Sequence, residues 1–270
     1  MVVMRIGLST SCVYPFDVEE AFHLARQIGY DGVEIMVTND VDTHTASTLR
    51  RLSREYRMPI LSIHSPVYAR TQLMWGLDPR RKVERSAQLA IAVGAPTVVV
   101  HPPYRWQGRF ARDFELEVAR ITEDFGVTVS VENMFPLAIA GFDIAQFTPS
   151  HDPVKLLCDA LTLDFSHAAM AGRDALELTH AMGDRLHHLH LTDGTTSNAQ
   201  GRLSDEHLVP GRGTQPVAEV LRYLATTGWN GSVVAEVATA GQNRHELLIE
   251  TLHFAREHTA APRSRERAKN

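Results

Sequence analysis

The sequence predicts an α/β protein folded as a closed parallel (β/α)8 barrel, and two observations carry this prediction. Short runs rich in β-branched and apolar residues alternate eight times with segments of helical periodicity over the 270 residues. No Gly-x-Gly-x-x-Gly follows the first run, where an open dinucleotide-binding sheet would carry it. Eight strand–helix units are the number that closes a parallel barrel, and an open doubly wound sheet is the alternative.

The expected elements follow one another without an internal linker, so we expect a single domain over residues 1–259. The expected strands are 5–10, 32–36, 59–64, 97–101, 127–132, 161–165, 186–191 and 232–237. The expected helices are 17–29, 45–57, 78–94, 110–125, 174–182, 217–227 and 243–258, with a long loop at 133–152 and a short helix running to residue 160. The tail at 260–270 is basic and poor in apolar residues, which predicts disorder.

Composition and charge limit the class of function. The chain is 44% hydrophobic and 22% charged with a net charge of −5, so it has no general attraction to nucleic acid or anionic membranes. Its two cysteines, Cys12 and Cys158, do not make a disulfide framework. The chain does not begin with a secretory apolar region, and its apolar runs are too short to span a bilayer. We therefore expect a cytoplasmic protein with no membrane partner.

Ionisable side chains stand at the ends of six consecutive expected strands, or in the loops just after them. They are His64, His101, Glu132, Asp164, His167, His190, Asp205, His207 and Glu236. Because the carboxyl ends of parallel barrel strands meet at one mouth, we expect these side chains to lie together. Burying them unpaired would be costly, so they must be paired, hydrated or bound to metal. The pattern predicts a metal or proton-transfer site.

Three histidine and glutamate positions near this mouth need separate interpretation. Glu34, near the end of the second strand, is either a salt-bridged rim residue or part of the site. His188 shares the inward face of its strand with His190 and is expected to pack there or to lie behind it. His187 faces the helices and is expected to be structural.

Loops around the mouth offer candidate substrate contacts. Trp106 lies in the loop after the fourth strand, and Arg212 lies in the Gly-rich turn after the seventh. The loop at 133–152 is long and apolar, which suits covering a small substrate or an oligomer partner. A homo-oligomer is therefore a further expectation.

Seven motifs together resemble one known superfamily. They are IHSP (63–66), VVHPP (99–103), VEN (131–133), LDFSH (163–167), HLHLTDG (188–194), DEHLVPGRG (205–213) and AEV (235–237). On these motifs the chain is similar to the xylose-isomerase-like TIM barrel superfamily, which contains sugar and sugar-phosphate isomerases and epimerases and also endonuclease IV of AP endonuclease family 2. The resemblance extends from the first strand to the eighth.

The isomerase and epimerase pattern implies one divalent ion, Mn²⁺, Mg²⁺, Co²⁺ or Zn²⁺, held by Glu132, Asp164, His190 and Glu236. It implies that Glu132 and Glu236 are catalytic and move a proton through an enediolate of a sugar, inositol-derived or sugar-phosphate substrate. The remaining residues of the mouth would then bind substrate or line its loop; they are His64, His101, His167, Asp205 and His207.

The endonuclease IV pattern implies up to three zinc ions on all nine residues and cleavage of DNA beside an abasic site. Three observations argue against a nucleic-acid partner. The charge balance is acidic, the arginines of the strand-end loops (Arg70, Arg105 and Arg109) are scattered, and the VEN motif is followed by the run MFPLAIAG. A third alternative is a non-catalytic barrel that binds a ligand, which the intact set of four ligands argues against. The sequence therefore predicts an enzyme acting on a small sugar.

Overall fold

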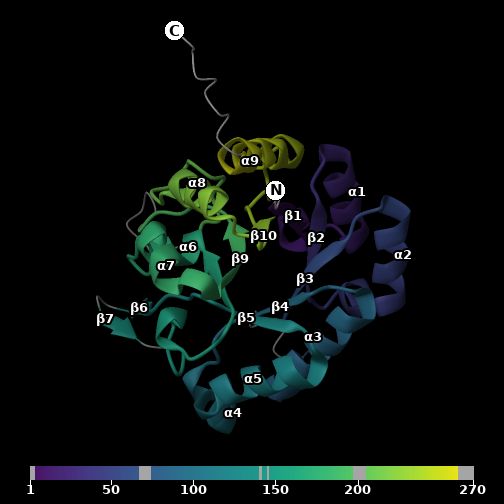
Figure 1. Cartoon of the computed structure of the whole chain (residues 1–270). Helices are drawn as coiled ribbons and strands as arrows, with labels where there is room; N and C mark the ends of the chain where they lie inside the picture. The colour runs from purple at the N-terminus through teal and green to yellow at the C-terminus, as the bar shows by residue number, and fades with distance from the viewer. Residues whose placement is uncertain (1–3, 67–73, 140–141, 145, 197–204, 261–270) are drawn as a thin grey trace.

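The computed structural model describes residues 4–66, 74–139, 142–144, 146–196 and 205–260. Eight parallel strands close into a barrel in the order β1-β10-β9-β8-β5-β4-β3-β2. Helices form a ring around this barrel (Figure 1). The predicted (β/α)8 fold is confirmed, because β1 pairs with both β2 and β10 and leaves no open edge there.

The strand and helix bounds follow the predicted alternation. The barrel strands are β1 (Arg5–Ser9), β2 (Gly32–Met36), β3 (Ile60–His64), β4 (Thr97–Val100), β5 (Thr128–Glu132), β8 (Leu161–Asp164), β9 (Leu186–Leu191) and β10 (Ser232–Ala235). The helices are α1 (Val18–Ile28), α2 (Ala46–Tyr56), α3 (Pro79–Val93), α4 (Gly108–Arg112), α5 (Phe114–Phe125), α6 (Phe165–Met170), α7 (Ala175–Met182), α8 (Val217–Thr227) and α9 (Arg244–Thr259).

Helix ends are set by the residues that the sequence offers as caps. The Asp17 carboxylate accepts the backbone N–H of Glu20 at 3.0 Å and begins α1. The Asp78 carboxylate accepts the backbone N–H of Arg80 and begins α3, with Pro79 at the first helical position. Both helices end on a glycine in the left-handed region, Gly29 and Gly94. These caps fix where each helix returns the chain to the barrel.

The strands are buried on both faces. Every residue of β2, β3, β4 and β8 is buried, including the ionisable ones. Their outward apolar side chains pack under the helices, as Ile35 and Ile63 do at 0% exposure. The inward polar side chains therefore face each other inside the barrel with little water.

The expected loop at 133–152 was wrong in part, because it contains a small antiparallel sheet. Strands β6 (Leu137–Ile139) and β7 (Phe142–Ile144) pair with each other outside the barrel. The short helix expected to end at residue 160 is one 3-10 turn at Pro153–Lys155. Both segments are too short to give a clear periodicity in the sequence.

One predicted helix and one predicted strand also need correction. The helix expected at 110–125 is broken at Asp113 into α4 and α5, and the Asp113 carboxylate accepts a hydrogen bond from Arg109 rather than from the backbone of α5. Strand β8 ends at Asp164 rather than at Phe165, and α6 follows it without a loop. The Asp164 carboxylate caps α6 by accepting the backbone N–H of His167 at 2.7 Å.

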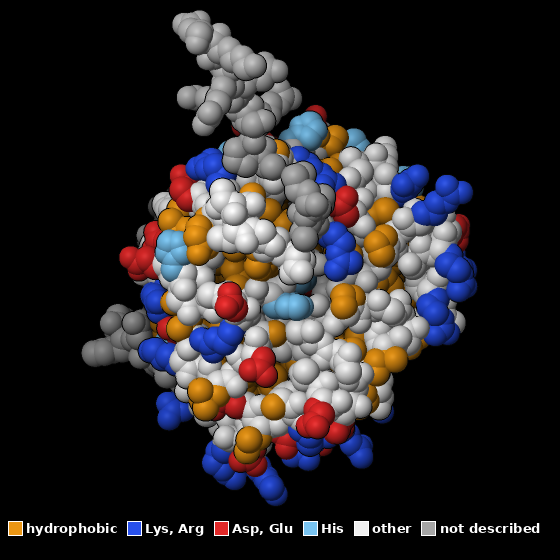
Figure 2. Space-filling model, in the orientation of Figure 1, with side chains coloured by type: hydrophobic (Ala, Val, Ile, Leu, Met, Phe, Trp, Pro, Cys, Tyr) orange, Lys and Arg blue, Asp and Glu red, His pale blue; other side chains and the backbone are white. Residues whose placement is uncertain are grey.

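Charge is mixed on the face of the molecule seen in Figure 2. Among the coloured residues of that view, acidic and basic side chains are interspersed around the rim, over the outer helices. Within the described part of the chain, none of the helices combines the length and apolar character needed to cross a membrane. The predicted disordered tail, beyond Ala260, lies outside the described residues.

Candidate active site

The structure brings all nine predicted side chains together at the carboxyl ends of the strands. His64, Glu132 and Asp164 are the last residues of β3, β5 and β8. His101 and Glu236 directly follow β4 and β10. The others come from β9, from α6 and from the loop after β9; they are His190, His167, Asp205 and His207.

Glu132 is the centre of this cluster and is only 1% exposed. Its Oε2 lies 3.2 Å from His64 Nε2 and 3.0 Å from His101 Nε2. Its Oε1 lies 3.1 Å from His167 Nδ1 and 3.0 Å from His190 Nδ1. One carboxylate thus joins imidazoles from four different barrel units.

Three carboxylate oxygens converge on the Nδ1 atom of His190. Glu132 Oε1 lies 3.0 Å from it, Glu236 Oε2 3.2 Å and Asp164 Oδ2 3.8 Å. Ligand atoms of Glu132, Asp164 and His190 all lie within 4.8 Å of one another. Three carboxylates and one imidazole form a donor set that accepts Mn²⁺, Mg²⁺, Co²⁺ or Zn²⁺.

A buried oxygen without a partner supports the fit of a cation here. Asp164 Oδ1 is used by the cap of α6, but Asp164 Oδ2 is buried and has no hydrogen-bond partner among the described residues. Leaving a carboxylate oxygen unpaired in a dry site is costly, and a bound cation would satisfy it.

A second part of the cluster is held by Asp205. Its Oδ2 lies 2.9 Å from His207 Nε2 and 3.3 Å from His167 Nε2. Its Oδ1 accepts the Ser166 hydroxyl at 2.7 Å. His207 has a positive φ of 43°, which is uncommon for a residue other than glycine, so this loop is held in a less favourable backbone conformation.

Asp193, just after β9, anchors the loop that carries these residues. Its carboxylate is fully buried and accepts four backbone N–H groups, from Gly194, Gly211, Gly213 and Gln215, at 2.8–3.1 Å. A Cβ added to Gly213 would lie 2.2 Å from Asp193 Oδ1. The glycine is therefore needed for the close approach of the turn to Asp193.

Burial and neighbouring charges shift the pKa values of the cluster in opposite directions. Burial raises the pKa of Asp164 to about 6. Burial alone would raise the pKa of Glu132, but His190 and His101 hold it well below its usual range. Burial lowers the pKa of His207, but the Asp205 carboxylate outweighs it and raises this pKa to about 10.

A small cavity of about 160 Å³ opens above the cluster. Its walls include Glu132, Glu236 and His207 from the cluster, and Met36 and Phe135 as apolar contacts. It adjoins a second pocket of about 400 Å³, with which it shares His101 and Tyr104. The volume above the ionisable groups suits a small polar molecule.

The two proposed substrate contacts lie further out. Trp106 is 68% exposed, stacks on Tyr104 at 4.4 Å between ring centres, and lines the larger pocket. Arg212 pairs with Glu250 of α9, with Nη2 2.5 Å from Oε2. Neither side chain is part of the cluster around Glu132.

Sequence reasoning left Glu34 open and missed Asn133 and Ser166. Asn133 joins β5 to β8 through both backbone groups of Asp164, at 2.6 and 3.0 Å. Ser166 holds Asp205. Both residues stand inside the quoted VEN and LDFSH motifs, so the signal was present, but their partners are visible only in the fold.

Comparison with known proteins matches residues 22–258 to the family described as Xylose isomerase-like TIM barrel. The chain belongs to this family. The resemblance inferred from the motifs is thereby confirmed.

Several known proteins are similar to this chain over nearly its whole length. An uncharacterized protein of Mycobacterium tuberculosis is 44% identical, over 94% of this chain and 98% of its own length. Fructoselysine 3-epimerase of Escherichia coli O157:H7 is 22% identical, over 90% of this chain and 94% of its own length. The crystal structure of a D-tagatose 3-epimerase-like protein superposes with a TM-score of 0.67 at 21% identity, covering 95% and 100% of the two chains.

Proposed function

We propose that this chain is a divalent-metal-dependent epimerase or isomerase of a sugar, inositol-derived or sugar-phosphate substrate. The observation that carries the proposal is the convergence of Glu132, Asp164 and Glu236 oxygens on His190 Nδ1 below a small cavity. Membership of a family related to sugar epimerases supports the same reaction class.

The two glutamates are the proposed proton carriers. Glu132 belongs to β5 and Glu236 follows β10, and β8 and β9 lie between those strands in the barrel. Both glutamates line the cavity. Because their strands are not adjacent, they can reach a substrate carbon from different sides. One would remove the proton beside a carbonyl and the other would return it.

The other side chains have supporting roles in this proposal. A divalent cation held by Glu132, Asp164, His190 and Glu236 would polarise the substrate carbonyl. His101 would bind substrate hydroxyls through the ring nitrogen that does not face Glu132, whereas His167 would stay paired with Glu132 and Asp205. The apolar walls at Met36 and Phe135 would limit the access of water.

Solvent deuterium exchange tests the proposal directly. The metal-loaded protein in D₂O is expected to incorporate deuterium at the carbon beside the carbonyl in one member of a panel of ketoses and ketose phosphates. Glu132→Gln and Glu236→Gln are each expected to reduce this exchange about 10²–10⁴-fold, the range of general acid–base catalysis. Exchange that persists unchanged in both variants would contradict the proposed roles.

A second candidate function is phosphodiester cleavage at abasic sites in DNA. The observation in its favour is that all nine donors of the three-zinc pattern come together, including Asp205 and His207. The net charge of −5 and the small cavity favour the sugar substrate instead. Cleavage of an abasic-site duplex by wild type, lost in Glu132→Ala, would establish the second function.

A further inference from the structure

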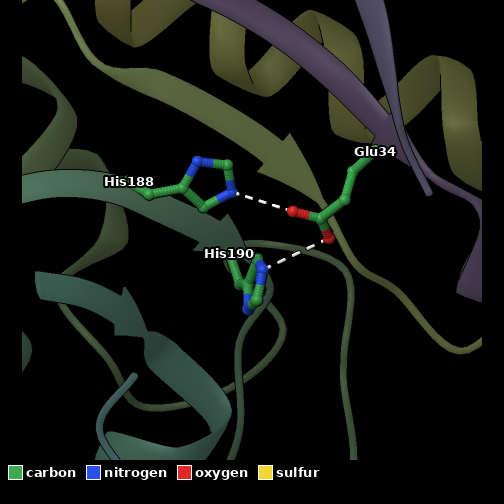
Figure 3. Close-up of side chains that lie close together, drawn as sticks. All are labelled: Glu34, His188 and His190. Atoms are coloured by element: carbon green, nitrogen blue, oxygen red, sulfur yellow. Dashed lines mark hydrogen bonds and ion pairs between the residues drawn. The ribbon is translucent and has the colours of Figure 1, made fainter. Parts of the chain in front are cut away.

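A closed cluster of one carboxylate and two imidazoles lies inside the barrel, next to the four donors. Glu34 comes from β2, and His188 and His190 come from β9. All three are 0% exposed. Figure 3 shows the Glu34 carboxylate pointing between the two rings, with one oxygen directed at each.

The contacts of Glu34 require donors on every side. Its Oε2 accepts the Ser62 hydroxyl at 2.7 Å and lies 3.0 Å from His188 Nε2. Its Oε1 lies 3.3 Å from His190 Nε2. Because an ionised carboxylate only accepts hydrogen bonds, both imidazoles must carry their proton on Nε2. The Nδ1 atom of His188 has no partner among the described residues, which suits a neutral ring protonated on Nε2.

His190 faces Glu34 on one side and the proposed metal ligands on the other. Neither Glu34 Oε1 nor His190 Nε2 has an aligned hydrogen bond to another described residue, but these two buried atoms face each other across 3.3 Å. A small rotation of the ring aligns the N–H with the oxygen and satisfies both atoms. The opposite nitrogen, Nδ1, lies among Glu132, Asp164 and Glu236.

We propose that Glu34 is a positioning residue: it accepts the Nε2 proton of His190 and so presents the Nδ1 lone pair to the metal. This role rests on the proposed metal-dependent function. A carboxylate behind a metal-binding histidine fixes the ring and its tautomer, and loss of such a partner usually weakens metal binding about 10–100-fold. His188 and Ser62 contact only the other carboxylate oxygen, Oε2.

The substitution Glu34→Gln separates this role from simple packing, because glutamine keeps the size of the side chain but has only one acceptor oxygen. That oxygen would turn toward Ser62 and His188, which offer two donors. The amide NH₂ would then face His190 Nε2 and favour the tautomer with its proton on Nδ1. That tautomer has no lone pair for a cation on the Nδ1 side.

The experiment measures the dissociation constant of Zn²⁺ by competition with a chelating dye, for wild type, Glu34→Gln and the control Ser62→Ala. Ser62→Ala removes a hydrogen bond from the same buried carboxylate but leaves the contact with His190. We expect Glu34→Gln to weaken Zn²⁺ binding about 10–100-fold and Ser62→Ala to change it less than about 3-fold. Circular dichroism should show a folded protein in each case.

A second measurement reports on the proton itself. In zinc-loaded wild type labelled with ¹⁵N-histidine, the Nε2–H of His190 is expected as a slowly exchanging NMR signal. In Glu34→Gln at saturating Zn²⁺ the signal should shift and exchange faster, whereas Ser62→Ala should keep it. A merely structural role of Glu34 would not distinguish the two variants.

Three outcomes would overturn the proposal. The first is that Glu34→Gln is folded and binds Zn²⁺ as tightly as wild type. Glu34 would then have no positioning role, but the proposed function would stand. The second is a second bound Zn²⁺ that disappears in His188→Gln, since the cluster would then be a metal site itself. The third is wild type that binds no divalent ion, which also contradicts the proposed function.

Discussion

The mouth of the barrel has two halves that are built differently. The strand-end half consists of Glu132, Asp164, His190 and Glu236, at or next to the last residues of barrel strands. The loop half, Asp205 and His207, lies beyond β9 in a loop anchored by Asp193. The first is fixed by strand pairing, whereas the second depends on one buried carboxylate and a residue with positive φ.

The chemistry of the two halves differs accordingly. The strand-end half contains one buried oxygen, Asp164 Oδ2, that has no hydrogen-bond partner among the described residues and that a cation would satisfy. The loop half is already paired, because Asp205 has contacts with His167, His207 and Ser166. The proposed function accordingly places one ion at the strand ends and leaves the loop half for substrate binding.

The largest effect is expected from Asp164→Asn. Replacing one charged ligand should weaken divalent metal binding by about 100-fold or more, above the usual effect of residues behind the ligands. Asp174→Asn is the matched control, since Asp174 caps α7 in the way that Asp164 caps α6. Equal metal affinities of the two variants, measured by chelator competition, would remove the distinction between the halves.

A smaller effect is expected from Asp193→Asn. The NH₂ group of the asparagine would face backbone N–H groups that now donate hydrogen bonds to the carboxylate. Losing these hydrogen bonds should lower the free energy of unfolding by about 2 kcal/mol. The melting temperature should fall by roughly 4–8 °C while metal affinity changes little. Asp184→Asn, at an exposed position, serves as the control. A large loss of metal affinity would mean that the loop half holds the ion.

The smallest effect is a pH-dependent contribution of His207 to the stability of the metal-free protein. Its pKa is raised to about 10, so its stabilising effect is complete below its ordinary value near 6.5 and is lost as pH rises through 10. In EDTA, His207→Gln should melt about 2–4 °C below wild type at pH 6 and closer to it at pH 9.5. A gap that does not change with pH would contradict the charged pair with Asp205.

The strand-end half could be predicted from the sequence because its residues stand at the ends of recognisable strands. One acid or imidazole at each of several consecutive strand ends is visible in the chain, and barrel closure brings them together. The ends of α1 at Gly29 and of α3 at Gly94 could also be predicted from the sequence, because the residues that end a helix lie next to it in the chain.

Contacts across the barrel could not be predicted in this way. Glu34 and His188 are 154 positions apart, and only the closed sheet brings them within 3.0 Å. Helix α6 was missed because Asp164, its cap, had been assigned only as a site residue. The antiparallel pair of β6 and β7 was missed because strands of three residues have no distinguishing period.

The number of bound metal ions tests the central claim most directly. Native mass spectrometry of the metal-loaded protein is expected to give one divalent ion per chain, retained in His207→Gln and lost in Asp164→Asn. Three zinc ions per chain, or one ion lost in His207→Gln and retained in Asp164→Asn, would contradict the account.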